Sequence, residues 1–473
     1  MKKPIPILSL FVFICLALIF LTDLSPAGAE EVQTSFPGIA FDRAEFAARR
    51  ARLMEKIPDG AVIIWGATTQ TGYWRFLQNN DFYYFSGLEI PNAVMILDGR
   101  TKRSSVFFTL TEREARNDGL STDLVTGPEK ATGFNSAFPL EEFSAQLSRL
   151  ISRGTILYTS FSPQERMAEC TREKARVMER TILLNPWDGR KSREMQFVDL
   201  VRERFPQAQF RDCSPIIWEM RTIKTPYEID ILRQAGKIAA KAHVEMMKSV
   251  RPGMYEYELA SLYEYLCKKE GALGLSYHAI ICSGPNHPYL HYHKHDRMLE
   301  DGDFLVIDVG PDFGYYDIDI TVSYPANGKF TPRQKEIYEA CNAVHEANLS
   351  VYRPGLKLAE AREEVKAILE KQGFDLSKDY FRRMRGGFGH YVGMAVHDVG
   401  GSPQVLKPGM VFANEPLAVL EGEDLGVRVE DTILITREGC ENLSSGIPRT
   451  VKDIEAMMNK TGIIQLLKQK KLY

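Results

Sequence analysis

Residues 304–324 of this 473-residue chain carry the sequence FLVIDVGPDFGYYDIDITVSY. The apolar run Phe304–Val309 stops at Gly310 and predicts one strand. The following run Tyr315–Tyr324 is rich in aromatic and β-branched residues and predicts a second strand. Two such strands separated by a short polar and glycine-containing segment predict an antiparallel hairpin.

The expected hairpin brings two acidic residues together. If the chain turns at Phe313-Gly314, the register places Asp308 directly opposite Asp319. Opposed residues share one face of the sheet, with Cβ atoms about 5 Å apart. Carboxylates held that close repel each other unless a divalent cation, an Arg or a Lys lies between them. The alternative is a pair of surface acids on a solvated hairpin, which the apolar flanks disfavour.

Three further residues extend this pair to a candidate metal site. They are His390 in Gly389–Gly393, Glu415 in Asn414-Glu415-Pro416, and Glu430 in Val427–Asp431. Four carboxylates and one imidazole suit one or two divalent cations of the Mn, Co, Fe or Zn kind. All nine histidines lie between His243 and His397, so we expect the chemistry in the C-terminal part of the chain.

Length and composition set broad limits. A chain of 473 residues predicts two domains. Hydrophobic residues make up 44% and charged residues 26%, as in ordinary globular proteins. The net charge is −3 and no basic stripe is present, which excludes nucleic acid as an expected partner.

The N-terminus predicts export. Lys2 and Lys3 precede the apolar run Ile5–Leu21, and Ala27-Gly28-Ala29 has the form of a cleavage site. Residues 1–29 are therefore expected to be a secretory signal peptide, leaving a periplasmic or secreted protein that does not contact the membrane. An uncleaved membrane anchor is the alternative. Six cysteines would remain after cleavage, without a C-x-x-C pair, and their spacing assigns no disulfide.

The expected domains span residues 37–215 and 221–460. The first alternates strands and helices, which predicts an α/β domain with helices at 43–56 and 140–151 and strands at 61–65, 93–97 and 104–109. The second starts with Thr225-Pro226-Tyr227-Glu228, a capping box with proline at the first helical position. Its other expected elements are helices at 256–269, 332–352 and 358–372 and strands near 410–414 and 427–436.

Several short motifs follow one another through the second domain. They are Ile223–Ile229, Arg251–Met254, Leu290–Tyr292, Asn327–Thr331, Val396–Gly400 and Ile447–Thr450. Together with the candidate ligands, they resemble the pita-bread metallopeptidase family, which includes aminopeptidase P, prolidase and methionine aminopeptidase. The stretch Gln78–Leu88 resembles the N-terminal domain of aminopeptidase P. The implied fold is α/β (α+β), an aminopeptidase P-like domain followed by a pita-bread domain.

The resemblance assigns roles to individual residues. It implies two divalent ions, with manganese as first choice, held by Asp308, Asp319, His390, Glu415 and Glu430, of which Asp319 and Glu430 bridge both. It implies that His291 and His397 contact the substrate, that Glu415 also handles the proton of the attacking water, and that Arg428 supports the ligands. It also implies self-association into a dimer or tetramer.

Simpler interpretations stay open for these residues. His291 could be a core histidine, His397 could form a structural pair with Asp398, and Arg428 could pair with a surface acid. The cluster of His287, His291, His293 and His295 could hold another metal, since the last three would share one face of a strand.

The chain also departs from the family pattern at three positions. Gly386 replaces a frequent histidine, Val322 replaces the arginine usual in aminopeptidase P, and Leu417 replaces a glycine. We expect these changes to reshape the rim of the pocket and hence to affect the choice of substrate.

The leading functional hypothesis is an exported aminopeptidase that cleaves the N-terminal residue from peptides with proline at the second position. The alternatives are a prolidase-type dipeptidase, a metal-free peptide-binding module and a creatinase-like hydrolase that uses no metal. Retention of all five ligand residues disfavours the last two.

Overall fold

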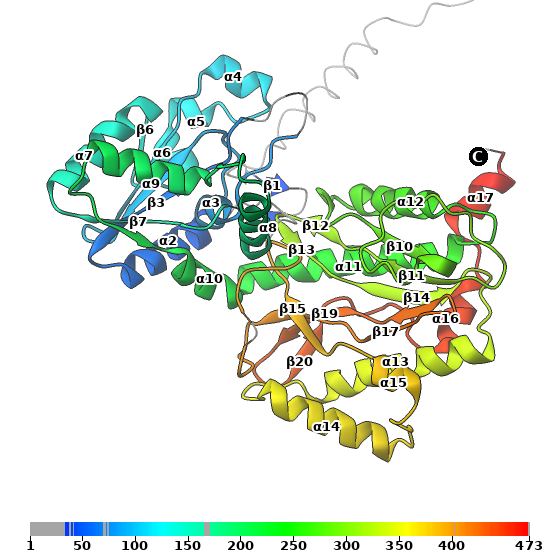
Figure 1. Cartoon of the computed structure of the whole chain (residues 1–473). Helices are drawn as coiled ribbons and strands as arrows, with labels where there is room; N and C mark the ends of the chain where they lie inside the picture. The colour runs from blue at the N-terminus through cyan, green and yellow to red at the C-terminus, as the bar shows by residue number, and fades with distance from the viewer. Residues whose placement is uncertain are drawn as a thin grey trace, which may run out of the picture. The chain divides into compact units, whose positions relative to one another are not determined.

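The computed structural model describes residues 42–69, 72, 75–164, 171–401 and 403–471, and the backbone of strands β1 (Thr34–Phe36) and β2 (Ile39–Ala40). The predicted signal peptide, residues 1–29, lies outside the described residues. Asp42–Tyr473 form one compact unit (Figure 1). In the described part of the chain, every helix is too short or too polar to cross a membrane.

The N-terminal half, residues 42–222, contains a six-stranded sheet of order β6-β5-β4-β3-β7-β8. The strands are β3 (Gly60–Trp65), β4 (Val94–Asp98), β5 (Arg103–Phe107), β6 (Ser136–Phe138), β7 (Ile156–Thr159) and β8 (Phe210–Asp212). The helices are α2 (Arg43–Lys56), α3 (Asn80–Ser86), α4 (Glu112–Asn117), α5 (Asp123–Thr126), α6 (Pro128–Thr132), η1 (Leu140–Glu142), α7 (Phe143–Ser152), α8 (Thr171–Leu184), α9 (Arg193–Arg204) and α10 (Ser214–Thr222).

Aromatic residues close the core of this half. Phe143 of α7 and Phe197 of α9 pack against Trp65 at the end of β3, with ring centroids 5.3 and 5.1 Å from it. Helix α2 begins where the sequence predicts, because the Asp42 side chain accepts hydrogen bonds from the backbone nitrogens of Ala44 and Glu45. The predicted α/β architecture of this half is observed.

The C-terminal half, residues 223–471, contains several small antiparallel sheets between helices. Its strands are β9 (Gly274–Leu275), β10 (Ile280–Ser283), β11 (Phe304–Asp308), β12 (Pro311–Phe313), β13 (Tyr316–Asp317), β14 (Thr321–Pro325), β15 (Phe388–Tyr391), β16 (Val411–Asn414), β17 (Leu417–Leu420), β18 (Leu425–Arg428), β19 (Asp431–Ile435) and β20 (Cys440–Asn442). Its helices are α11 (Pro226–Ser249), α12 (Glu256–Lys269), η2 (Gly284–Asn286), α13 (Pro332–Val351), α14 (Leu358–Lys371), α15 (Asp379–Arg383), α16 (Val451–Met458) and α17 (Ile463–Gln469).

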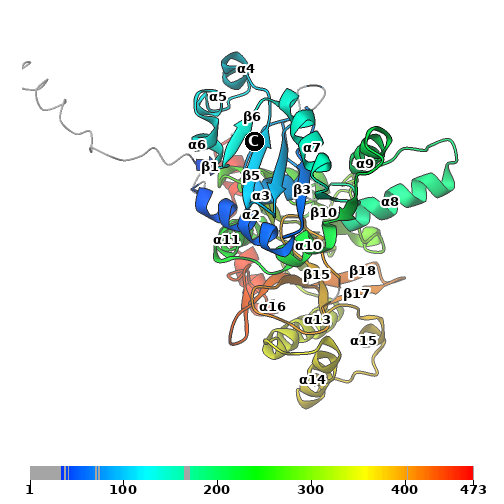
Figure 2. The ribbon, with the colours of Figure 1, turned by 90° about the vertical axis from the view of Figure 1, so that its left-hand side faces the viewer.

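Two of these sheets frame the site. One has the order β10-β11-β14 and the other β15-β16-β19-β20. Helices α13 and α14 lie on one side of the four-stranded sheet in both views (Figures 1 and 2), and their apolar residues share a core cluster with Tyr391, Phe412 and Ile433. The other face of this sheet is thereby left for the polar residues described below.

The predicted hairpin forms, but its register is wrong by two residues. Asp308 pairs with Thr321, and the turn lies at Gly314-Tyr315 rather than at Phe313-Gly314. Both turn residues have positive φ angles, 65° and 68°, as a two-residue type I′ turn requires. A shift of two residues preserves the face, so Asp308 and Asp319 still point to the same side of the sheet.

One other prediction, a single strand at 427–436, needs correction, and the predicted domain bounds remain untested. The expected strand at 427–436 is divided into β18 and β19, with Val429-Glu430 between them. Both halves belong to one compact unit, so the domain bounds 37–215 and 221–460 stay a prediction. The five cysteines among the described residues are all free: Cys213, Cys267, Cys282, Cys341 and Cys440.

Candidate metal centre

The five predicted ligands stand at strand ends that open into one cavity. Asp308 is the last residue of β11, His390 lies in β15, and Glu415 directly follows β16. Asp319 lies two residues before β14, and Glu430 directly precedes β19. All five line a cavity of about 590 Å³.

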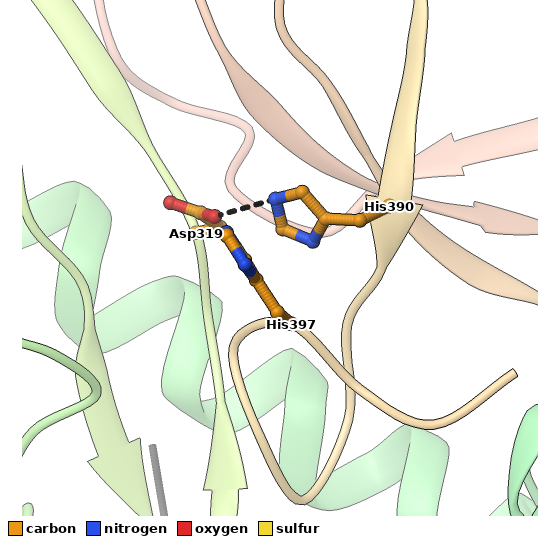
Figure 3. Close-up of side chains that lie close together, drawn as sticks. All are labelled: Asp319, His390 and His397. Carbon is orange, nitrogen blue, oxygen red and sulfur yellow. Dashed lines mark ion pairs between the residues drawn. The ribbon is translucent and has the colours of Figure 1, made fainter. Parts of the chain in front are cut away.

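The ligand atoms form two compact sets, each with its atoms within 4.8 Å of one another. The sets, which share Glu430, are Asp308, Asp319 and Glu430, and His390, Glu415 and Glu430. A third group with the same spacing joins His397 to Asp319 and His390. Asp319 also lies close to the second set, because His390 Nε2 lies 3.3 Å from Asp319 Oδ2. Figure 3 shows the rings of His390 and His397 next to each other, both close to this carboxylate, and their centroids are 4.0 Å apart.

The electrostatics of the site show an excess of negative charge. Burial, reinforced by the charge of Asp319 and only partly offset by Arg428, raises the pKa of Asp308 to about 6. Burial and the neighbouring carboxylates raise the pKa of Glu430 well above its usual range. Burial disfavours the charged form of His390, but the hydrogen bond to Asp319 and its charge outweigh burial and raise the pKa of His390 to about 9.

Among the five candidate ligands in the described part of the chain, one buried oxygen has no hydrogen-bond partner. Glu430 Oε2 accepts a hydrogen bond from the Thr321 hydroxyl at 2.6 Å, whereas Glu430 Oε1 has no hydrogen-bond partner among the described residues. A buried, unpaired carboxylate oxygen is unfavourable unless it is paired with a charge or coordinates a metal. Carboxylate and imidazole donors at these separations fit divalent cations of the Mn, Fe, Co or Zn kind.

Residues around the ligands hold their backbone in place, and sequence reasoning gave them no role. The Thr432 hydroxyl accepts from Asp319 N at 2.9 Å and donates to Asp319 O at 2.8 Å. Arg449 donates to the carbonyl oxygens of Thr321 and Glu430 at 2.8 and 2.7 Å. Arg449 lies in a motif that the sequence singles out, but no sequence signal distinguishes Thr432.

Besides Thr321, two further residues contact the carboxylates directly. Arg428 Nη2 lies 2.7 Å from Asp308 Oδ2, so this arginine pairs with a buried acid and not with a surface acid. The Tyr277 hydroxyl lies 2.5 Å from Asp308 Oδ1 and 2.6 Å from Asp319 Oδ1. Sequence reasoning missed Tyr277, because an aromatic residue near a strand carries no signal of what its hydroxyl contacts.

The two predicted substrate histidines both line the cavity. His397 has its ring centroid 4.0 Å from that of His390, and its Nδ1 lies 2.5 Å from Glu173 Oε1. His291 is exposed at the cavity wall, so the alternative of a core histidine is wrong. His291, His293 and His295 lie in turns and irregular backbone, so the expected strand face does not exist.

The other histidines of this cluster form no metal group among the described residues. His287 is buried apart from them, with Nε2 3.0 Å from Phe304 O.

The three departures from the family pattern have different locations. Gly386 and Leu417 line the cavity, as expected. Val322 lies fully buried in β14 opposite Ile307 and is not among the described residues that line the cavity, so its predicted position at the rim is wrong. Gly386 has φ +103°, and a Cβ there would lie 2.2 Å from Glu415 O.

Comparison with known proteins gives the family. The profile of metallopeptidase family M24 matches residues 230–437, and that of the aminopeptidase P N-terminal domain matches residues 46–158. The chain is 33% identical to the Xaa-Pro aminopeptidase of Escherichia coli over 457 residues. This aligned region covers 88% of this chain and 98% of that relative. The chain belongs to metallopeptidase family M24.

Other members of the family are similar over different lengths. Human Xaa-Pro dipeptidase is 34% identical over 304 residues, which cover 52% of this chain and 61% of that relative. The solved structure of E. coli aminopeptidase P with the inhibitor Pro-Leu is 30% identical, with a TM-score of 0.72 over 88% of this chain and 98% of that one. The M24 membership confirms the predicted resemblance, the α/β (α+β) fold class and the assignment as a metallopeptidase.

Proposed function

We propose that this M24 enzyme is an exported aminopeptidase that uses two divalent cations to hydrolyse the N-terminal Xaa-Pro bond of peptides. The observation that carries the proposal is the pair of ligand sets that share Glu430 in one cavity. The similarity to Xaa-Pro aminopeptidase along nearly the whole of both chains supports the choice of substrate.

Each residue of the site has its own role in the proposed reaction. Asp308, Asp319, His390, Glu415 and Glu430 would hold the cations. Bound cations supply an acidified water and polarise the scissile carbonyl. Glu415 orients the water and carries its proton to the leaving proline nitrogen, a contribution typically of ~10²–10⁴ in rate. His291 and His397 donate hydrogen bonds to the oxygen on which negative charge develops.

A prolidase-type dipeptidase is the second candidate, and one residue favours it. A free α-carboxylate close to the reacting bond needs a cation to hold it. Arg428 already pairs with Asp308, but the exposed Arg385 lines the same cavity. Against this, the dipeptidase relative matches only about half of the chain, whereas the aminopeptidase matches both halves.

The test compares Ala-Pro with Ala-Pro-Ala by kcat/KM, which reports discrimination in the transition state. An aminopeptidase prefers the tripeptide, and Arg385→Ala then leaves this preference in place. A clear preference for the dipeptide that Arg385→Ala abolishes would establish the dipeptidase instead.

The role of the cations is tested separately. Asp319→Ala should lower bound metal and reduce activity by about two or more orders of magnitude, since this carboxylate lies near both ligand sets. Elemental analysis of purified protein, with manganese expected, identifies the ions. Full activity of chelator-treated, metal-free protein would contradict the mechanism.

Export and assembly are independent parts of the proposal. N-terminal sequencing of protein from its native host should give a mature chain that begins near Glu30. Sedimentation of that mature protein should give the mass of a dimer or tetramer. An intact Met1, or a monomer at micromolar concentration, would contradict the corresponding part.

A further inference from the structure

A cluster of four buried charges lies between the two halves of the chain. Arg221, in α10, places Nη1 2.8 Å from Asp81 Oδ1 of α3 and Nη2 2.7 Å from Asp398 Oδ1. Lys224 Nζ lies 3.0 Å from the other oxygen of Asp398. Each of the four side chains is only 1% exposed. The two positive and two negative charges balance, so loss of one leaves an uncompensated buried charge.

The cluster ends on the loop that carries His397. Asp398 is the next residue along the chain, and its backbone nitrogen donates to Tyr391 O at 2.8 Å. At Gly393 a Cβ would lie 2.1 Å from Asp398 Oδ2, so the first part of the loop packs directly on this carboxylate.

A second contact holds the loop from the other side of His397. Asn80 Nδ2, from the stretch that resembles aminopeptidase P, donates to Met394 O at 2.7 Å. The N-terminal half therefore contacts the loop on both sides of His397. Asn80 binds Met394, three residues before it, and Arg221 binds Asp398, one residue after it. His397 points from this loop toward Asp319 (Figure 3).

We propose that Asn80, Asp81 and Arg221 are positioning residues, through which the N-terminal half fixes His397 for the reaction. The proposal rests on the role of His397 in the proposed function. A small displacement of a group that stabilises the transition state lowers the rate without a matching loss of substrate binding. The N-terminal half is thus part of the catalytic apparatus, although it supplies none of the five candidate metal ligands.

The alternative is that the cluster only attaches one half to the other, and the chain offers a control. Arg49 of α2 is also 1% exposed and also joins the halves, because its Nη2 lies 3.7 Å from Glu228 Oε2 of α11. Its Nε lies 2.8 Å from Glu45 Oε1 of its own helix. Its partners do not include the loop of His397. Arg49→Lys therefore disturbs a comparable buried ion pair without touching that loop.

The experiment compares Arg221→Lys, Asn80→Ala and Arg49→Lys in full-length, manganese-saturated enzyme with Ala-Pro-Ala as substrate. Arg221→Lys and Asn80→Ala should lower kcat by about ten-fold or more with little change in KM. Arg49→Lys should keep kcat within about two-fold, although its Tm falls too. Metal content should be the same in all three. Asn80→Ala removes no charge, so it serves if Arg221→Lys does not fold.

A double variant decides whether the effect passes through His397. In a His397→Ala background, Arg221→Lys and Asn80→Ala should each change kcat by less than about two-fold, because their shared target is gone. Effects that multiply with His397→Ala, or that match those of Arg49→Lys, would overturn the positioning role alone. Full activity of His397→Ala would instead remove the role of His397 from the proposed function, and this proposal with it.

Discussion

At the scale of single residues, Thr432 holds the backbone of the candidate ligand Asp319 in place. Its hydroxyl bonds both backbone polar groups of Asp319 and is fully buried. Thr432→Val keeps the shape but leaves those two groups unpaired, which costs about 1–3 kcal/mol. We expect this loss in urea unfolding and weaker metal binding in a titration of the apoprotein. Thr432→Ser keeps the hydroxyl and is the control; an equal loss in both variants would contradict the role of the hydroxyl.

Gly386 shows why a departure from a family pattern can be compulsory. Its φ of +103° is unfavourable for any side chain, and a Cβ would lie 2.2 Å from Glu415 O and 2.6 Å from Pro416 Cα. Restoring the family histidine with Gly386→His should therefore reduce activity, because the backbone next to Glu415 must move.

The control for this prediction is Gly355→Ala, at φ +83° with nothing within 4 Å of the added Cβ. It carries the backbone strain without the clash and should keep kcat unchanged while Tm falls slightly. If Gly386→His matched or exceeded the parent in kcat, the steric account would be wrong.

At the scale of elements, two helices begin with the same kind of cap but in different surroundings. Thr225 caps α11 and Thr331 caps α13, each with a capping box and with proline next in sequence. Thr225 also donates to Glu45 Oε1 of the N-terminal half at 2.8 Å.

Loss of an N-cap side chain typically costs about 1 kcal/mol. Thr331→Ala should lower the free energy of unfolding by that amount, and Thr225→Ala by about 1 kcal/mol more, because a second hydrogen bond is lost. Urea unfolding of both variants measures the difference. Equal losses would mean that the bond to Glu45 adds nothing to stability.

These elements also show which parts of the fold a sequence determines locally. Helices α2 and α12 begin and end where the sequence predicts, at Arg43–Lys56 and Glu256–Lys269, since caps and periodicity act over a few residues. The hairpin register depends on Tyr315 at φ 68°, and that conformation is held by distant contacts. The Tyr315 ring stacks on Tyr83 with centroids 3.8 Å apart, which no local pattern encodes.

The residues of the candidate site also fall into those that the sequence predicts and those that depend on the whole fold. The five ligands could be predicted because each stands in a distinctive local context, and the structure brings all five to one cavity. Tyr277 and Thr432 could not, because they act through contacts with Asp308 and Asp319 that depend on how separate sheets pack. Arg449 had a recognisable motif, but its bond to Glu430 O requires the whole fold.

At the scale of the whole molecule, two buried histidines predict a pH dependence of stability. Burial lowers the pKa of His243 to about 3 and of His287 to about 4, against about 6.5 in the unfolded chain. Between pH 6.5 and 4 these two histidines are therefore protonated in the unfolded chain and neutral in the folded chain, so their contribution to stability falls as the pH falls.

Each histidine should remove about 2 kcal/mol of stability between pH 7 and pH 5, at roughly 1.4 kcal/mol per pH unit below 6.5. His287→Gln should accordingly lose about 2 kcal/mol less than the parent over this interval. Urea unfolding at the two pH values, with each protein in the same metal state, measures the difference. Parallel pH profiles for His287→Gln and parent would refute the assignment.

The charge cluster around Arg221 also has a consequence for how the chain is made. Its members are far apart in sequence: Arg221 follows Asp81 by 140 positions and precedes Asp398 by 177. A nascent chain presents Asp81 first, Arg221 and Lys224 later, and Asp398 only near the end of translation. Until then, the emerging polypeptide has one positive charge too many to bury at this place. We therefore expect the two halves to complete their folding together, and a chain cut short before residue 398 to leave Arg221 and Lys224 with too few buried negative partners.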